Sequence, residues 1–178
     1  NKAEDDINSD FKELKFQNSI ELKNINFNYN NSNKILNQIN LKLNKNEKIV
    51  FFGKSGSGKT TLSDIIMGMI KPTEGEIYID QNLIEYKTYA SLNKKIGYVP
   101  QNISLLSGSL AQNISFNLDE NSIDHNLVME SINKSGLDDY FKKINFKSDY
   151  IIDQDGKNLS GGQIQRIGIA RALYQKPN

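Results

Sequence analysis

One glycine-rich stretch has the residue types and the spacing of a phosphate-binding loop. It reads Gly53-Lys54-Ser55-Gly56-Ser57-Gly58-Lys59-Thr60 and fits the pattern G-x-x-x-x-G-K-[ST]. Such a loop surrounds a polyanion, and its glycines let the backbone turn tightly and aim N–H groups inward. Lys59 supplies a point charge for the β- and γ-phosphates, and the Thr60 hydroxyl can ligate Mg²⁺. The pattern predicts a nucleoside triphosphate site; the alternative is a flexible glycine turn.

A second glycine motif, Leu159-Ser160-Gly161-Gly162-Gln163, follows about 100 residues after the loop lysine. Ser160 and Gln163 form the Ser-x-x-Gln pattern of a capping box, which indicates the start of a helix. Glycine at early helix positions weakens the helix, so a cap alone does not explain the pair. Two glycines make sense where an exposed helix start must approach another anion closely. The motif is interpreted as a second phosphate-binding surface.

Composition sets the limits for these motifs. The chain has 178 residues, enough for one domain with a core, and its net charge of +1 gives no reason to expect a nucleic-acid partner. It has no cysteine, which excludes disulfides and thiolate metal sites, and a single histidine does not make a metal cluster. No apolar run approaches the roughly 20 residues that a membrane span needs. We expect the chain to be a piece of a longer protein.

Apolar and polar residues alternate in the first half as they do in half-buried strands. Residues 25–30 place apolar side chains on one face and asparagines on the other, and residues 39–44 form a second such strand, antiparallel to the first. Before them, residues 1–18 carry Ile7, Phe11 and Leu14 at helical spacing. That segment is predicted to be a short terminal helix or a linker from an upstream domain.

The phosphate-binding loop is expected between a buried strand and a helix. Residues 49–52 are continuously apolar, which is typical of a parallel strand buried on both faces, and a helix is predicted over residues 58–69. Residues 76–80 predict another strand, and residues 96–100 a short strand that enters a loop at Pro100.

The second half is predominantly helical in pattern. Residues 103–147 predict helices with turns near residues 121–122 and 135–136, and residues 148–159 predict a loop. A last helix is expected from Ser160 through Leu173.

The two glycine motifs, in this order and with Gln101 between them, resemble the nucleotide-binding domain of ATP-binding cassette (ABC) proteins. The resemblance covers about residues 20–178, and residues after the second motif continue the family pattern: Gln165, Arg166, Ala170, Arg171 and Ala172. It implies an α/β fold of the P-loop NTPase type over residues 19–178. An antiparallel β subdomain and a partly parallel core would hold the nucleotide, and a helical subdomain over about residues 103–165 would present the second motif, the family's signature.

The resemblance also implies ATP and Mg²⁺ as ligands. Gln101 would be the Q-loop residue, which in the family contacts Mg²⁺ or the attacking water and moves with the membrane partner. Lys59 and Gln101 are then the catalytic residues, and Thr60 and Gln101 the metal-binding ones. Tyr29 would lie where an aromatic ring stacks on adenine; the alternative is a strand aromatic packed beside Phe27. The implied nucleotide-binding residues are Tyr29, Gly53, Ser55, Gly56, Ser57, Gly58, Lys59, Thr60, Thr61, Ser160, Gly161, Gly162 and Gln163.

Two segments are similar to the exporter branch of the family. Residues 108–116 resemble the exporter segment after the Q-loop, and residues 155–158 resemble the exporters' Glu-Arg-Gly-x-Asn, although Asp155 is shorter than glutamate and sits one place off, and the arginine is missing. The implied partners are a second nucleotide-binding domain, joined head to tail by ATP, and a transmembrane domain that contacts the region after Gln101. The implied location is the cytoplasmic face of a membrane. The alternatives are a soluble ABC ATPase of translation or repair, and a chain that only binds nucleotide.

The family's Walker B motif is expected just past Asn178, together with the switch histidine. Walker B supplies an Asp for Mg²⁺ and a Glu that polarises water. Asp80 and Asp153 follow apolar residues, but both precede the signature and neither is followed by Glu, so neither qualifies. We expect the domain to be incomplete at its C-terminal end and residues 1–178 alone to lack ATP hydrolysis.

Overall fold

Two compact units, residues 1–94 and 95–178, make up the chain. The computed structural model describes residues 16–30, 34–85, 88, 96–141 and 148–177, so most of the segment predicted as a helix or linker over residues 1–18 lies outside it. Within these described ranges, every helix is too short or too polar to cross a membrane.

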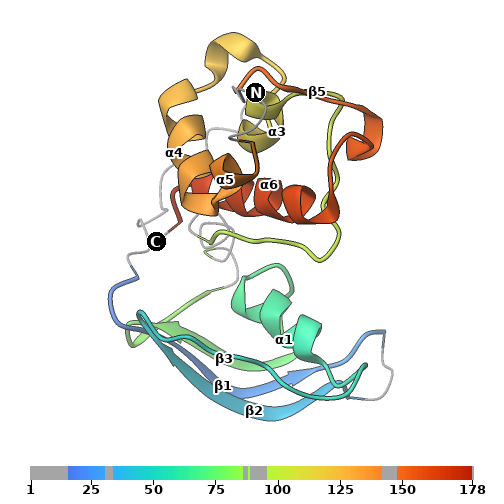
Figure 1. Cartoon of the computed structure of the whole chain (residues 1–178). Coiled ribbons are helices and arrows are strands. Elements are labelled where there is room, and N and C mark those ends of the chain that lie inside the picture. The colour runs from blue at the N-terminus through green and yellow to red at the C-terminus, as the bar shows by residue number, and fades with distance from the viewer. Residues whose placement is uncertain (1–15, 31–33, 86–87, 89–95, 142–147, 178) are drawn as a thin grey trace, which may run out of the picture. The chain divides into compact units, whose positions relative to one another are not determined.

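The first unit contains a four-stranded antiparallel sheet (Figure 1). It comprises β1 (Ser19–Phe27), β2 (Leu36–Asn44), β3 (Glu74–Ile79) and β4 (Asn82–Leu83), in the order β2-β1-β3-β4. Leu22 of β1 lies opposite Leu41 on one side and Ile77 on the other. The antiparallel pairing predicted for the first two strands is confirmed.

The strict alternation predicted at the end of β1 is wrong at Asn26, which is only 7% exposed. Register shifts on both sides of Ile25 interrupt the two-residue period, so Ile25, Asn26 and Phe27 are all buried. Hydrogen bonds satisfy the buried amide: Nδ2 donates to Glu74 Oε2 at 2.9 Å, and Oδ1 accepts from Gln38 N at 3.0 Å.

The two segments predicted as apolar strands next to the functional loops are not strands. Residues 49–52 and 96–99 have no strand assignment, and Val50 and Phe52 are 87% and 101% exposed. A strand requires a neighbour that exchanges backbone hydrogen bonds with it, and among the described residues neither segment has one. Every strand pair in the described ranges is antiparallel, so the predicted parallel core is not found there.

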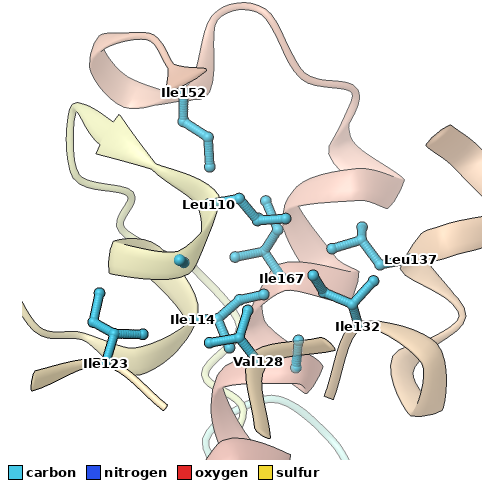
Figure 2. Close-up of a cluster of buried hydrophobic side chains, with 10 residues drawn as sticks. Leu110, Ile114, Ile123, Val128, Ile132, Leu137, Ile152 and Ile167 are labelled. Carbon is cyan, nitrogen blue, oxygen red and sulfur yellow. The ribbon is translucent and has the colours of Figure 1, made fainter. Parts of the chain in front are cut away.

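Four α-helices, two 3-10 turns, a two-stranded ribbon and a small hydrophobic core make up the described part of the second unit. The helices are α3 (Leu110–Ser115), the 3-10 turn η2 (Glu120–Ser122), α4 (His125–Ser135), α5 (Leu137–Phe141) and α6 (Gly161–Tyr174). Figure 2 shows their side chains turned toward one another, with Leu110 and Ile114 of α3 facing Val128 and Ile132 of α4 and Ile167 of α6. The predicted helices and turns are confirmed over residues 110–141, and the last predicted helix is confirmed as α6. The helical prediction is wrong for residues 103–109, and its end at residues 142–147 lies outside the described residues.

A short two-stranded ribbon in this unit was not predicted from the sequence. β5 (Gly108–Ser109) pairs with β6 (Ile151–Ile152), followed by the 3-10 turn η3 (Gln154–Gly156), where only loop was expected. Two-residue strands carry no periodic signal. Ile152 is nevertheless fully buried, so the ribbon closes one end of the core.

Asp80 anchors the entry of the chain into β1. Its carboxylate accepts three backbone N–H groups, from Gln17 at 2.5 Å, Asn18 at 2.6 Å and Ser19 at 2.8 Å. Burial by itself raises the pKa of this carboxyl, but the three N–H donors and the Lys45 ammonium together bring it below the ordinary 3.8. The carboxylate is thus hydrogen-bonded to the backbone, in agreement with its exclusion as a Walker B aspartate.

Replacing this carboxylate tests the anchor. Asp80→Asn should lower the free energy of unfolding at pH 7 by about 1 kcal/mol, since an amide offers one acceptor and no charge and solvent screens part of the effect. Because the folded-state pKa is lowered, the contribution is present above the ordinary pKa and is lost as the pH falls through the folded-state value. Urea denaturation should show a constant deficit from pH 5 to 8 that shrinks below about pH 4. The exposed Glu85→Gln serves as control; an equal deficit there would remove the special role of Asp80.

Candidate nucleotide-binding site

The phosphate-binding loop leads directly into α1 (Lys59–Ile66), close to the predicted helix but three residues shorter at its end. Its N-cap, Gly58, makes no side-chain cap, and the first turn contains no acidic residue. The first N–H groups of a helix have no partner within it and carry the positive end of the helix dipole. The start of α1 therefore presents uncompensated donors to the loop.

Two glycines of the loop are required by its backbone. Gly56 and Gly58 have φ angles of 78° and 86°, in the left-handed region that favours glycine. At Gly58 packing adds a second reason, because a Cβ would lie 2.9 Å from Leu36 Cδ2 at the start of β2 and 3.0 Å from Ile35. The sheet and the loop thus meet at Gly58, the residue before α1 (Figure 1).

Lys59 folds back over its own loop. Its ammonium donates to the carbonyl oxygens of Gly53 at 3.0 Å and Lys54 at 2.7 Å, and lies 3.4 Å from Ser57 Oγ. The cation is held beside a hollow of about 280 Å³. The hollow is lined by Ile35, Ser55, Gly56, Ser57, Gly58, Lys59, Thr60 and Thr61. Apart from Ile35, this lining offers backbone donors, hydroxyls and one cation and no carboxylate, which is the donor set that a polyphosphate requires.

The two threonines at the start of α1 differ in environment. Thr60 is exposed, so its hydroxyl is available as a metal ligand. Thr61 is 7% exposed, and its Oγ1 lies 3.5 Å from the Tyr29 hydroxyl oxygen. Thr60 thus stays the predicted metal ligand, while Thr61 contacts Tyr29.

Tyr29 packs beside Phe27, as the alternative drawn from the sequence states, and its stacking on adenine stays a prediction. Its ring packs edge-to-face on Phe27, with centroids 4.7 Å apart and planes at 89°. The residue nevertheless remains 46% exposed. Phe27 therefore fixes the orientation of a side chain that solvent still reaches.

The signature lies in the second unit, at the start of α6. The predicted capping box is confirmed: Ser160 N donates to Gln163 Oε1 at 2.6 Å, and Gln163 N donates to Ser160 Oγ at 3.3 Å. The N–H groups of Gly161 and Gly162 have no partner within the helix. A Cβ at Gly161 would have no heavy atom within 4 Å, so packing does not require glycine there.

Gln101 lies in the second unit as well, in an exposed loop. The structure thus groups the phosphate-binding loop with Tyr29 in the first unit, and Gln101 with the signature in the second. Three residues that pack or bind next to these groups were assigned no role from the sequence. They are Asn113, Gly168 and Arg171; of the three, only Arg171 had been noted individually, as part of the family pattern after the signature.

Residues 36–178 match the protein family described as ABC transporter. The chain belongs to the ABC transporter family. The chain is 36% identical over 161 residues to the putative export ATP-binding/permease protein RP696 of Rickettsia prowazekii. It is 41% identical over 159 residues to the lacticin-481/lactococcin-DR transport/processing ATP-binding protein lcnDR3 of Lactococcus lactis. These matches cover 89% and 88% of the chain, respectively.

A solved bacterial Atm1-family ABC exporter with ATP bound superimposes with a TM-score of 0.79 and 27% identity, over 92% of this chain. The α/β fold inferred from the ABC resemblance is confirmed, and the similar proteins are of the exporter type. The chain spans only 28% of the Rickettsia relative, 21% of the Lactococcus relative and 28% of the solved exporter.

Proposed function

We propose that this chain is the ATP-binding domain of an exporter, in which ATP binding and hydrolysis drive a transmembrane partner. The observation that supports ATP binding best is the start of α1, where uncapped N–H groups, the Lys59 ammonium and the Thr60 hydroxyl converge on one hollow. The N–H groups and Lys59 bind the phosphates, and Tyr29 stacks on the base. Thr60 would ligate Mg²⁺, which neutralises phosphate charge when bound, and Gln101 would act in hydrolysis, as the family resemblance implies.

Removing the loop cation tests ATP binding. Lys59→Ala should weaken ATP affinity by about 1.5–3 kcal/mol, the range of a hydrogen bond to a charged group. Titration of residues 1–178 with a fluorescent ATP analogue measures the loss. Lys42→Ala, which removes the same charge from an exposed position on β2, is the matched control. Equal affinities for Lys59→Ala and the unaltered chain would exclude the loop as the phosphate site.

Hydrolysis is proposed for the full-length protein. Phosphoryl transfer depends on positioned charges, including a metal-holding Asp and a residue that orients water. Asp80 is committed to backbone N–H groups, and Asp153 is an exposed loop residue. We therefore expect residues 1–178 alone to bind ATP without turnover, and a version extended past Asn178 to release phosphate. Phosphate release by the purified 178-residue chain, abolished by Lys59→Ala, would contradict this assignment.

The signature is proposed to bind the γ-phosphate held by a second copy of the domain, head to tail. The loop already supplies donors to its own phosphates, whereas Gly161 faces open space. A bare helix start with two unpartnered N–H groups is useful where it approaches an anion. The capping box fixes the helix start without covering it, since Gln163 bonds back to Ser160.

A bulky side chain at position 160 tests whether the signature binds the nucleotide of a second copy or the nucleotide of its own domain. Ser160→Arg should abolish ATP-dependent dimerisation of an extended, hydrolysis-slowed version of the domain, while ATP affinity of the monomer stays within about twofold. Ser160→Ala also loses the cap, at about 1 kcal/mol, but adds no bulk and should retain more dimer. Sedimentation velocity with and without ATP gives the readout. A large loss of monomer ATP affinity in Ser160→Arg would assign the signature to its own site instead.

The membrane partner is proposed from the relatives. The Rickettsia relative is named both as an ATP-binding and as a permease protein. By analogy we propose a transmembrane domain that contacts the region after Gln101, and a location at the cytoplasmic face of a membrane. The relatives reported above carry export or transport names, which favours the exporter over a soluble ATPase of translation or repair.

A further inference from the structure

Thr61 lies on the packed side of α1, whereas its neighbour Thr60 is exposed. Thr61 is only 7% exposed, and Thr61 and Ile65 are the buried residues of this helix. Residues four positions apart lie on the same side of a helix, so both belong to the face that packs. The sequence thus places two adjacent hydroxyls in different environments, and the buried one reaches Tyr29.

The segment that carries Tyr29 also meets the phosphate-binding loop at its stem. Ile35 N donates to Phe27 O at 2.8 Å, which closes the base of this segment. Ile35 in turn lies so close to Gly58 that a Cβ there would be 3.0 Å from Ile35 Cγ2. Tyr29 is therefore packed at its ring by Phe27 and approached at its hydroxyl by Thr61, above a stem that touches the loop.

The two hydroxyls are close enough to pair. Thr61 Oγ1 and the Tyr29 hydroxyl oxygen lie 3.5 Å apart, and either can donate. Hydroxyl hydrogen bonds centre near 2.7–2.8 Å, so a ring movement of about 0.7 Å makes a full one. Phe27 fixes the orientation of the ring, and the hydroxyl contact relates the ring to α1.

We propose that Thr61 is a positioning residue for base recognition: its hydroxyl holds that of Tyr29 and sets the ring at a fixed distance from the phosphate-binding loop. This inference rests on the proposed function, in which Tyr29 stacks on the base and the start of α1 binds the phosphates. A ring that is held before the base arrives loses less conformational freedom on binding. The hydroxyl pair therefore strengthens the affinity for a nucleotide and leaves that for a bare phosphate chain unchanged.

Removing each hydroxyl separately and together tests the pair. Thr61→Val keeps the branched shape and Tyr29→Phe keeps the ring, and each should weaken ATP binding about threefold to tenfold, the effect of one lost hydrogen bond. The double variant should bind ATP no more weakly than either single variant, because both changes remove the same contact. Thr61→Ser retains a hydroxyl and should stay within about twofold of the unaltered chain. Calorimetric titration of the 178-residue chain with Mg²⁺-ATP measures these affinities.

Inorganic tripolyphosphate, which carries a chain of three phosphates without a base, is the second ligand. Its affinity should stay within about twofold in every variant, because Thr61 acts on Tyr29 and not on the phosphates. Retained tripolyphosphate binding also shows that the loop of each variant has kept its fold. Tyr98→Phe removes the hydroxyl of a tyrosine of nearly equal exposure, 45% against 46%, and is the matched control.

Three results would overturn the proposal. The first is an unchanged ATP affinity in Thr61→Val, and the second is an equal loss for ATP and tripolyphosphate, which would place the Thr61 hydroxyl on the phosphates. The third is a double variant whose loss is the product of the two single losses, since the hydroxyls would then act separately.

Tyr29→Ala separates this inference from the proposed function. If Tyr29→Ala leaves the ATP affinity unchanged, base stacking on Tyr29 fails, and the positioning role of Thr61 fails with it. A loss of ATP affinity in Tyr29→Ala without a loss in Thr61→Val overturns the positioning role alone. If Lys59→Ala lowers neither the ATP nor the tripolyphosphate affinity, the phosphate site itself is wrong.

Discussion

The first backbone N–H groups of a helix have no hydrogen-bond partner within the helix. In α1 and α6 the residues that precede the helix leave some of these donors without a partner, for different reasons. At α1 the cap is a left-handed glycine without a side chain, so the first-turn donors stay open beside Lys59. At α6 a capping box serves Ser160 and Gln163 but not the two glycines between them. The rest of each unit holds these helix starts in place: β2 packs on Gly58 in the first unit, and the core around Ile167 holds α6 in the second. An anionic ligand is the partner that both starts fit best.

Features set by local chemistry could be predicted from the sequence. The loop glycines, the capping box of α6 and the helices after residue 110 depend on residues a few positions apart, and the structure has each of them. The antiparallel pairing of β1 and β2 followed from one-sided alternation. Family membership likewise followed from two short motifs in order, and residues 36–178 match that family.

Features set by distant partners could not be predicted. An apolar run such as residues 49–52 becomes a strand only beside another strand, and its composition does not say whether one is present. Burial of Asn26 depends on a bulge and on Glu74, far along the chain. The close approach of Ile103 to Gly168 is likewise a contact without any sequence period. The hydrogen bonds of Asp80 could not be predicted either, since its three N–H donors come from about 60 residues earlier in the chain.

The central claim is that the start of α1 binds the phosphates of ATP, and amide NMR tests it most directly. Mg²⁺-ATP is titrated into the ¹⁵N-labelled 178-residue chain, and each backbone amide is followed. The account predicts that the largest, saturable shifts occur at the amides of Gly56 through Thr61, with smaller ones at Tyr29 and none along residues 125–135 of α4. Saturable binding that leaves the amides of Gly56 through Thr61 unmoved would contradict it.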